Sequence, residues 1–269
     1  MPVASESGAG HSFVVPAFGQ SPHLAECVAS LRAQEHPSPV LISTSTPNRH
    51  IEHVAATYGV PVHVVHAPSG IGSDWNAALH AAPTTRVTLA HQDDVYLPTF
   101  SRKVAQCLEK HPDALLCFTS YRELTADGVR RENRNLWVKH ALIETAFLAG
   151  VSIRSRRRKL GLLAFGSPIP CPSVTFNLAT VGAFQFSTRH RTNVDWKAWL
   201  ELARRDGRFV RIRDVLVYHR IHEQSETWTR IVDGTRRSED LECFADVWPR
   251  RIAELLARLY TMSYRSSTR

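Results

Sequence analysis

Over the first half of the chain, short apolar runs alternate with segments in which apolar side chains recur every three or four positions. The first run, His11–Pro16, ends at a proline, and the apolar residues of 22–34 that follow have helical spacing. The same patterns predict further strands at 39–43, 60–65, 87–90 and 114–119, and further helices at 49–58, 73–82 and 98–110. A repeated strand–helix unit is typical of an α/β fold with a mostly parallel, Rossmann-like sheet flanked by helices.

The alternation changes beyond Tyr121, where a long helical pattern at 135–151 leads into the basic run Arg154–Lys159. The remainder predicts a strand at 172–178, a helix at 194–205, a strand at 208–218 and a final helix at 240–260. Because no Pro-, Gly- or Ser-rich linker separates two halves, we expect a single domain. The expected divisions are a disordered leader at 1–11, the domain at 12–235 with a helical basic insert at about 130–168, and a C-terminal helical extension at 236–269.

Composition narrows the class of protein. The chain has 269 residues, 43% of them hydrophobic, which is enough for one large core. No window approaches the ~18 apolar residues of a membrane span and the N-terminus lacks the features of a signal peptide, so we expect a cytoplasmic protein. Five widely spaced cysteines indicate neither a disulfide framework nor a zinc site. The net charge of +8 favours an anionic partner, such as a nucleotide, a phospholipid surface or nucleic acid.

The segment His91-Gln92-Asp93-Asp94 follows the strand predicted at 87–90. Open α/β sheets bind ligands at the carboxyl ends of their strands, and paired carboxylates suit a divalent cation, so one interpretation is a metal-assisted phosphate site. The alternative is a helix cap, because Asp accepts from free backbone N–H groups and Pro98 suits a first helical turn.

Two later segments also carry candidate chemistry. Asp195 enters a strongly apolar helix, where it is either a first-turn carboxylate favoured by the helix dipole or a rigidly held general base. In 217–227, His219 and His222 flank Arg220; this segment is either a polar surface loop or a place where an imidazole meets a metal and the guanidinium meets phosphate.

Taken in order, segments between about 12 and 227 resemble the family 2 glycosyltransferases with the nucleotide-diphospho-sugar transferase (GT-A) fold. Asp195 follows a Gly-Ala-Phe sequence as the family's catalytic base follows Gly-Gly-Phe. The other segments that carry the resemblance are an opening strand, a first helix, a Gly- and Asn-containing segment, an Asp-x-Asp-Asp element and a His-Arg-x-His-x-x-Ser-x-Thr run, at 14–18, 27–34, 72–79, 88–98 and 219–227.

The resemblance implies an inverting, metal-dependent enzyme that moves a sugar from a nucleotide-diphospho-sugar to an acceptor hydroxyl, in cell-surface polysaccharide or glycolipid synthesis. It implies a glycan or lipid-linked acceptor, Asp195 as catalytic base, and Mn²⁺ or Mg²⁺ held by Asp93 or Asp94 with His219 or His222. The residues that it implies for donor binding are Pro16, Ala17, Phe18, Thr44, Asn76, Gln92, Asp93 and Arg220.

This chain departs from the family pattern at four places. His91 stands where the first Asp is usual, Ser43-Thr44-Ser45 replaces Asp-Asp-Gly, Trp75 occurs where Arg is common, and Val194 replaces the Glu before the base. These departures leave the nucleotide open and favour, as an alternative, a catalytically impaired GT-A-like binding protein. The Gln-x-x-Arg-Trp signature of processive synthases is absent after Asp195, which predicts single transfers.

The basic run Arg154–Lys159 precedes the apolar residues of 160–165. It is interpreted either as a solvated loop with a core-facing end or as a peripheral contact with anionic lipid at the inner face of the membrane. Two other functions are disfavoured. A nucleotidyltransferase would carry a Gly-rich phosphate loop with a basic residue, whereas 18–22 holds one Gly and no Lys. A nucleic-acid-binding protein would expose aromatics along a basic stripe, whereas most aromatics here occupy apolar helical or strand positions, so no nucleic-acid partner is expected.

Overall fold

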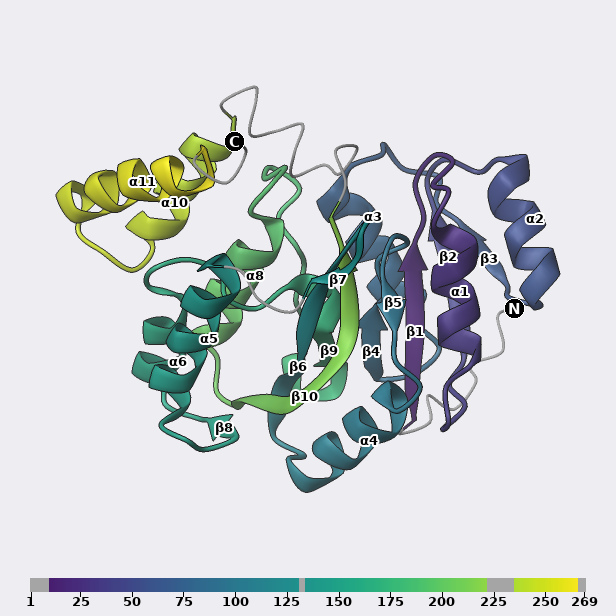
Figure 1. Cartoon of the computed structure of the whole chain (residues 1–269), viewed down its shortest axis with the longest axis horizontal. Helices are drawn as coiled ribbons and strands as arrows, with labels where there is room; N and C mark the ends of the chain where they lie inside the picture. Colours follow the sequence, from purple (N-terminus) through teal and green to yellow (C-terminus); the bar gives the residue numbers. More distant parts are fainter. Residues whose placement is uncertain (1–9, 131–133, 222–234, 266–269) are drawn as a thin grey trace.

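The computed structural model describes residues 10–130, 134–221 and 235–265. In these residues a ten-stranded sheet runs in the order β3-β2-β1-β4-β9-β6-β10-β5, with β7 paired to β6 and β8 to β10 (Figure 1). The strands are β1 (His11–Pro16), β2 (Val40–Thr44), β3 (Val62–Val64), β4 (Arg86–Leu89), β5 (Val95–Tyr96), β6 (Ala114–Thr125), β7 (Gly128–Arg130), β8 (Ser152–Ile153), β9 (Val174–Asn177) and β10 (Arg208–Arg220).

The helices follow the predicted alternation. They are α1 (Leu24–Arg32), α2 (Arg49–Tyr58), α3 (Ile71–His80), α4 (Phe100–Lys110), α5 (Arg134–Phe147), α6 (Arg156–Leu163), α7 (Leu178–Val181), α8 (Val194–Ala203), α10 (Thr235–Ala245) and α11 (Arg250–Arg265), with a 3₁₀ turn at Cys171–Ser173.

Most strands of the sheet run in one direction. The four strands β3, β2, β1 and β4 are parallel, β9 is antiparallel to both β4 and β6, and β6 and β10 are again parallel. The parallel strands β2, β1 and β4 are neighbours, so the loops after their carboxyl ends meet at one edge of the sheet. The predicted mostly parallel α/β fold is therefore confirmed.

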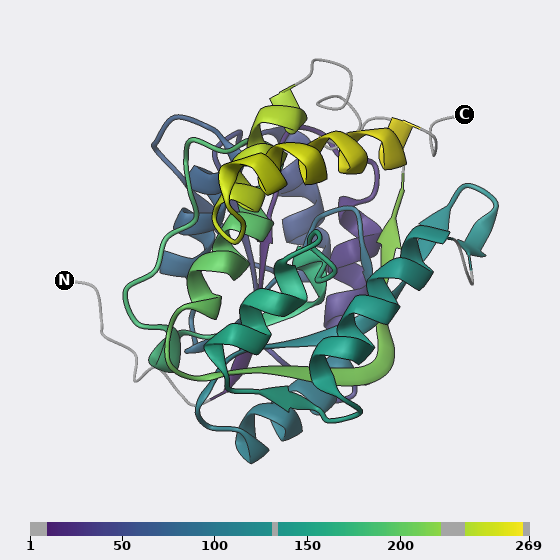
Figure 2. The same ribbon diagram turned by 90° about the vertical axis from the view of Figure 1, so that its left-hand side faces the viewer.

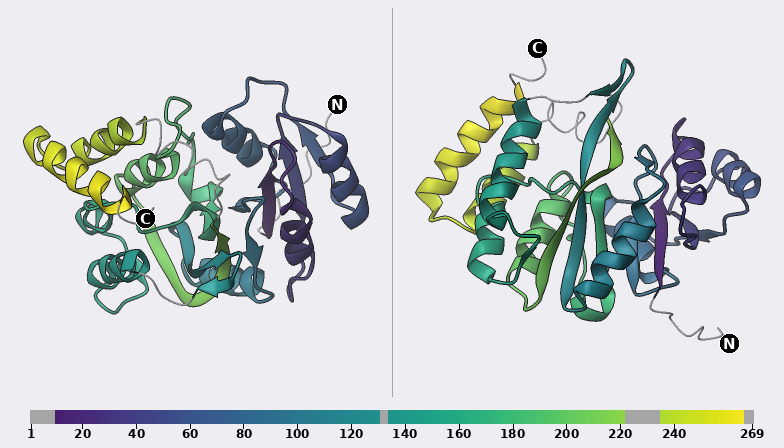
Figure 3. Two further views of the ribbon diagram at one scale, coloured as in Figure 1. Left: turned by 45° about the horizontal axis from the view of Figure 1, so that its top comes forward. Right: turned by 60° about the horizontal axis from the view of Figure 1, so that its bottom comes forward.

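Helices cover both faces of the sheet because its strands alternate side chains between two cores. On β1, Val14 faces a core shared with α3, α6 and α8, whereas Phe13 and Val15 face a core shared with α1, α2 and α4. Figures 2 and 3 show these layers from other sides, with α5, α6, α8, α10 and α11 on the side away from α1 and α2.

The basic insert is helical, as predicted. The boundary of its first helix and the burial of Lys159 differ from expectation. The helix expected at 135–151 ends at Phe147, because Leu148 and Ala149 adopt left-handed conformations with φ of 47° and 61°. The basic run is solvated, as one interpretation expected, but most of it is helix and not loop: Ser155 caps α6, and Arg154 and Arg156–Arg158 are exposed. At its end Lys159 is buried, and its Nζ donates to the carbonyls of Arg205 and Gly207 at 2.7 and 2.9 Å.

The C-terminal region forms two helices, so the prediction of a single helix at 240–260 is wrong. Pro249 lies between α10 and α11, where its ring and missing N–H prevent the helix from continuing. Both helices pack on α8: the rings of Trp196 and Phe244 lie 4.9 Å apart, and Tyr260 contacts both. Within the described ranges, no helix has the length and apolarity needed to cross a bilayer.

Candidate functional site

The loops after β1 and β4 meet at the carboxyl edge of the sheet. The amide of Gln92 binds the backbone of Phe18 in both directions, accepting from its N–H at 3.0 Å and donating to its carbonyl at 3.2 Å. The Ala17 N–H donates to the carbonyl of Ser43 at 2.8 Å, which joins the end of β1 to β2. The structure thus brings together the residues predicted to bind the donor at these strand ends, namely Pro16, Ala17, Phe18, Thr44 and Gln92.

The loop after β1 is also fixed against Asp93. The Ser21 hydroxyl donates to Asp93 Oδ1 at 2.5 Å. Two residues earlier, the Gly19 N–H donates to the Thr46 hydroxyl and its carbonyl accepts from Asn48, both at 2.8 Å. Gly19 has a φ of 62°, a conformation that favours glycine, so the tight turn that aims Ser21 at Asp93 depends on this residue type.

Asp94 is hydrogen-bonded to residues at the end of β10. Its side chain is 1% exposed, and Oδ1 accepts from the Arg220 backbone N–H at 2.8 Å and from His219 Nδ1 at 3.0 Å. The Arg220 guanidinium donates to the Asp93 carbonyl at 2.8 Å and lies 2.5 Å from a Glu26 carboxylate oxygen. The chain therefore brings together Asp93, Asp94, His219 and Arg220, whereas His222 lies outside the described residues.

Asp94 and His219 form a charged pair. Burial opposes ionisation of Asp94, but the imidazole of His219 and the hydrogen bond from it lower the pKa of Asp94 overall. Burial likewise opposes the imidazolium, but the Asp94 carboxylate raises the pKa of His219 overall. The pair keeps Asp94 ionised inside the protein.

The residues present fit a hard divalent cation. Carboxylate oxygens from Asp93 and Asp94 suit Mg²⁺ or Mn²⁺, and an imidazole such as that of His219 also suits Mn²⁺. No group of three or more potential ligand side chains converges in the part of the chain that the structure describes. One or two carboxylates completed by substrate phosphates are the usual arrangement for Mg²⁺, so this donor set matches a cation that binds together with a diphosphate.

His91 occupies the position of the missing first carboxylate as a neutral side chain. Its ring lies 5.1 Å from that of Trp75, and Nε2 is buried without a hydrogen-bond partner among the described residues. Burial lowers the pKa of His91, and the nearby His219 lowers it further, against the attraction of Asp94. The two departures from the family pattern, His91 and Trp75, thus pack against each other.

The serines that replace the usual Asp-Asp-Gly contribute hydroxyls at the end of β2, a feature that the sequence interpretation missed. The Thr44 hydroxyl accepts from the Thr46 N–H at 3.0 Å, whereas the Ser43 and Ser45 hydroxyls are buried without a partner among the residues described. Ser45 directly follows β2 at the ligand-binding edge, which is the signal that could have identified it.

Asn76 clamps the loop that leads to α8. Its side-chain amide donates to the Phe186 carbonyl at 2.9 Å and accepts from the Phe186 N–H at 2.7 Å. One turn earlier on α3, a Cβ on Gly72 would lie 2.2 Å from the Ser187 carbonyl oxygen, so only glycine permits this approach. The structure places Asn76 in a contact that holds the protein backbone, and its predicted contact with the donor stays a prediction.

Asp195 lies in the first turn of α8, and its Oδ1 accepts from the Trp196 N–H at 2.7 Å. The start of this helix is held by Glu239 of α10, whose carboxylate accepts from the backbone N–H groups of Arg191, Thr192 and Asn193 at 2.7–2.9 Å. Burial raises the pKa of Asp195, although the Trp196 N–H and the charges of Arg236 and Lys139 oppose the rise.

Lys139 of α5 is a further charged residue close to the Asp94–His219 pair, and sequence interpretation did not identify it. Its Nζ donates to the Tyr121 hydroxyl at 3.1 Å, and the Tyr121 ring lies 6.1 Å from that of His219. The Lys139 charge acts on the pKa of both His219 and Asp195. The segment around Cys171 connects the two carboxylates: Trp199 of α8 donates to the Ile169 carbonyl at 3.2 Å and the Tyr96 hydroxyl donates to the Pro172 carbonyl at 2.9 Å. After burial itself, Asp195 and Asp94 both raise the pKa of the Cys171 thiol.

Comparisons with known proteins identify the family and the fold. The sequence model of Glycosyl transferase family 2 matches residues 12–179. No curated protein sequence is significantly similar to the chain.

Several solved structures share the fold. TarS 1-349 of S. aureus in complex with UDP-GlcNAc has a TM-score of 0.62 and 14% identity, over 92% of this chain and 70% of that one. Glucosyl-3-phosphoglycerate synthase from Mycobacterium tuberculosis, with Mn²⁺, UDP and glucosyl-3-phosphoglycerate, has a TM-score of 0.60 and 16% identity, over 86% and 80%. Mannosyltransferase PcManGT from Pyrobaculum calidifontis, with GDP-Man and Mn²⁺, has a TM-score of 0.60 and 16% identity, over 93% and 69%.

Proposed function

This chain belongs to glycosyl transferase family 2, and from that premise we propose that it transfers single sugars, with inversion, from a nucleotide-diphospho-sugar to an acceptor hydroxyl. The observation that carries the proposal is that the segment 169–172 contacts the elements of both sets of carboxylates. Trp199 of α8, the helix that carries Asp195, donates to the Ile169 carbonyl at 3.2 Å, and the Tyr96 hydroxyl, two residues after Asp94, donates to the Pro172 carbonyl at 2.9 Å. These carboxylates come from segments about a hundred positions apart, and a displacement at a sugar carbon needs one group beside the leaving diphosphate and another beside the attacking hydroxyl.

The donor is proposed to lie across the ends of β2, β1 and β4. The backbone at 16–18 and the Ser45 hydroxyl would meet the nucleoside, and the Arg220 guanidinium would meet the diphosphate. The similar structures hold UDP, UDP-GlcNAc or GDP-Man, which supports a nucleotide-sugar donor and leaves its nucleobase open.

Asp93 and Asp94 are proposed to hold Mn²⁺ or Mg²⁺ together with the diphosphate, and His219 would join them only in its neutral form, after losing the proton of its charged pair with Asp94. When bound, the cation neutralises the charge that develops on the leaving diphosphate. Support comes from the carboxylate donor set and from the Mn²⁺ in two of the similar structures. Ser21 holds Asp93, and the backbone of Arg220 holds Asp94, so both carboxylates are oriented before a ligand arrives.

Asp195 is proposed to act as the general base. As the acceptor oxygen forms a bond to the anomeric carbon, the bond from that carbon to the diphosphate oxygen breaks and the acceptor proton passes to the Asp195 carboxylate. Attack from the face opposite the leaving group inverts the configuration. The helix start held by Glu239 keeps the carboxylate in place, and Lys139 and Arg236 favour its ionised form.

The acceptor is proposed to be a glycan or a lipid-linked sugar used in cell-envelope polysaccharide or glycolipid synthesis. The family resemblance supports this class of acceptor. The sequence Trp196-Lys-Ala-Trp-Leu200 after the base lacks the Gln-x-x-Arg-Trp signature, which supports single transfers over processive synthesis.

The substitution Asp195→Asn tests the proposal. The assay measures the release of nucleoside diphosphate from a panel of UDP-, GDP- and other nucleotide-sugars. Where no acceptor is supplied, water takes the sugar, so the nucleotide-sugar that is hydrolysed identifies the donor. Loss of the general base lowers turnover by about 10²–10⁴-fold, while calorimetry shows nearly unchanged donor binding. The control Asp206→Asn removes a 91% exposed carboxylate that pairs with Arg156, and it retains full activity. Full turnover in Asp195→Asn would refute the assignment.

A catalytically impaired binding protein is the second candidate, favoured by the neutral His91 and the serines at the end of β2. It predicts that the wild-type protein binds a nucleotide-sugar and releases no nucleoside diphosphate in the same assay.

A further inference from the structure

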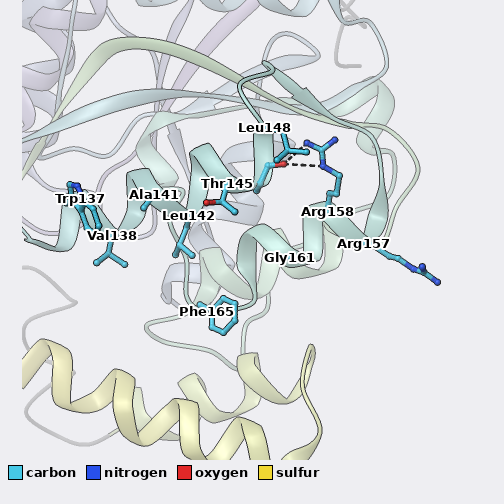
Figure 4. Close-up of a pocket in the computed structure, with 11 residues that line it drawn as sticks. Trp137, Val138, Ala141, Leu142, Thr145, Leu148, Arg157, Arg158, Gly161 and Phe165 are labelled. Carbon is cyan, nitrogen blue, oxygen red and sulfur yellow. Dashed lines mark hydrogen bonds between the residues drawn. The ribbon is translucent and has the colours of Figure 1, made fainter.

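A groove of about 520 Å³ lies between α5 and α6 (Figure 4), two helices that Figure 1 shows on the side of the molecule away from α1 and α2. In Figure 4, Val138 and Leu142 from α5 and Phe165 from the end of α6 point into the same space. Trp137 stands at one end, and Arg157 and Arg158 stand at the other. No acidic residue lines the described groove.

The apolar side chains of this groove are unusually exposed. Trp137 is 72% exposed, Leu148 71% and Phe165 51%, although side chains of this size normally lie in a core. Leu148 has a left-handed backbone conformation, with a φ of 47°, that a branched residue adopts only at an energetic cost. The backbone of the α5 terminus thus holds a leucine in solvent.

Cationic side chains accompany the apolar ones. Arg154 and Arg157 are exposed, and neither forms an ion pair with any residue that the structure describes. Arg158 donates to the Ala146 carbonyl through Nε and Nη2 at 3.2 and 2.7 Å, which ties α6 to α5, and Arg156 pairs with Asp206 at 3.0 Å. Arg157 therefore brings a positive charge to the groove that forms no ion pair within the described ranges, and Arg154, three positions before it, adds a second exposed charge just before α6.

We propose that the surface formed by the α5–α6 groove, Trp137, Leu148, Phe165, Arg154 and Arg157 docks on an anionic phospholipid membrane. The aromatic and aliphatic side chains enter the boundary between head groups and acyl chains, and the arginines contact lipid phosphates. Tryptophan and leucine beside unpaired arginines match this boundary, in which one layer is apolar and the next is anionic. A second copy of this chain would instead have to bring its own carboxylates to the arginines, and no carboxylate lines the groove.

Docking through this surface would also orient the candidate active site. Trp137 and Val138 precede Lys139 on α5, whose side chain turns the other way and reaches the Tyr121 hydroxyl beside His219. The groove and the Lys139–Tyr121 contact beside His219 therefore lie on two sides of the same helix, so docking through the groove would fix the orientation of the candidate site relative to the bilayer. The docking itself is independent of the proposed glycosyl transfer.

Co-sedimentation with vesicles tests the proposal without any donor or acceptor. The vesicles contain phosphatidylcholine alone or phosphatidylcholine mixed with phosphatidylglycerol. The wild-type protein co-sediments with the mixed vesicles and does not co-sediment with vesicles of phosphatidylcholine alone. High salt weakens its binding to the mixed vesicles. The double variant Arg154→Gln/Arg157→Gln binds about 25-fold more weakly, at about fivefold for each arginine, and Trp137→Ser/Leu148→Ser loses about tenfold or more.

The matched control removes two positive charges from the other end of the molecule. Arg32 and Arg49 are exposed at the end of α1 and the start of α2, on the side of the sheet away from α5 and α6 (Figure 1). Arg32→Gln/Arg49→Gln binds mixed vesicles as the wild type does. If this control loses binding equally, the attraction depends on net charge alone and the proposal is wrong. The proposal is also overturned if the wild-type protein does not bind the mixed vesicles. It is overturned as well if the wild type self-associates without binding vesicles and Trp137→Ser/Leu148→Ser abolishes that self-association.

Discussion

At the scale of single residues, the charge on Asp195 depends on a lysine from another element. Burial raises the pKa of Asp195 and Lys139 opposes the rise, so turnover falls as the pH drops through a pKa above the usual carboxyl value. Lys139→Met removes the opposing charge and moves this acid limb to higher pH. The measurement is kcat against pH, with Lys110→Met on the exposed end of α4 as control; an acid limb that stays in place in Lys139→Met would contradict the coupling.

A second residue-scale prediction concerns stability. His11 is buried in β1, where Nδ1 and Nε2 bind the Ser38 and Thr88 hydroxyls at 3.0 and 2.8 Å. Burial, aided by the positive charges of His36 and Arg86, lowers the pKa of His11 to about 3.

Below pH ~6.5, His11 is therefore protonated in the unfolded chain but neutral in the folded protein. The free energy of unfolding falls by about 1.4 kcal/mol per pH unit until the pH reaches the pKa of His11 in the folded protein. His11→Gln lacks this contribution. Denaturant unfolding between pH 7.5 and 4.5 should show the shallower loss in the variant, and equal slopes would argue against a neutral buried His11.

Single residues also show what sequence could and could not predict. Asp195 was predicted at a helix start because its apolar neighbours recur with helical spacing. The different roles of Asp93 and Asp94 could not be predicted, since their partners Ser21 and His219 are 72 and 125 positions away. The burial of Lys159 was equally hidden, because it depends on carbonyls at 205 and 207.

At the scale of elements, the attachment of α10 to α8 determines where Asp195, the proposed base, lies. Glu239→Ala leaves the N–H groups of Arg191, Thr192 and Asn193 without an acceptor, so it lowers the free energy of unfolding by roughly 2–4 kcal/mol and reduces turnover more than donor binding. The control Glu201→Ala removes an exposed pair with Arg205 and costs about 0.5 kcal/mol or less. Denaturant unfolding and initial rates compare the two; similar losses would contradict the capping role.

The bounds of helices and strands could be predicted from the sequence where nearby residues determine them. Helix α2 matches its predicted range because Asn48 caps its start and Gly59 adopts the left-handed conformation at its end. The two- and three-residue strands β5, β7 and β8 escaped prediction because only pairing with distant strands defines them. Pro249 was a local signal for a helix break, but the helical periodicity on both sides of it favoured the prediction of a single helix.

At the scale of the whole molecule, the fold assembles the site from separate regions. Parallel strands β2, β1 and β4 form the edge proposed to bind the donor. The end of β10 closes on Asp94, and α5 and α8 contribute Lys139 and Asp195. The periodicity predicted the sheet, and the family resemblance the ordered motifs. Neither indicated that α5 would carry both Lys139 and the exposed groove.

The most direct test of the central claim is calorimetric titration of the wild-type protein and Asp93→Asn with a panel of nucleotide-sugars, each with and without Mn²⁺. The donor edge described here predicts that one nucleotide-sugar binds the wild type in the presence of Mn²⁺, and that Asp93→Asn loses this metal-dependent binding while keeping the wild-type fold. Failure of every nucleotide-sugar to bind under either condition, or undiminished metal-dependent binding by Asp93→Asn, would contradict the claim.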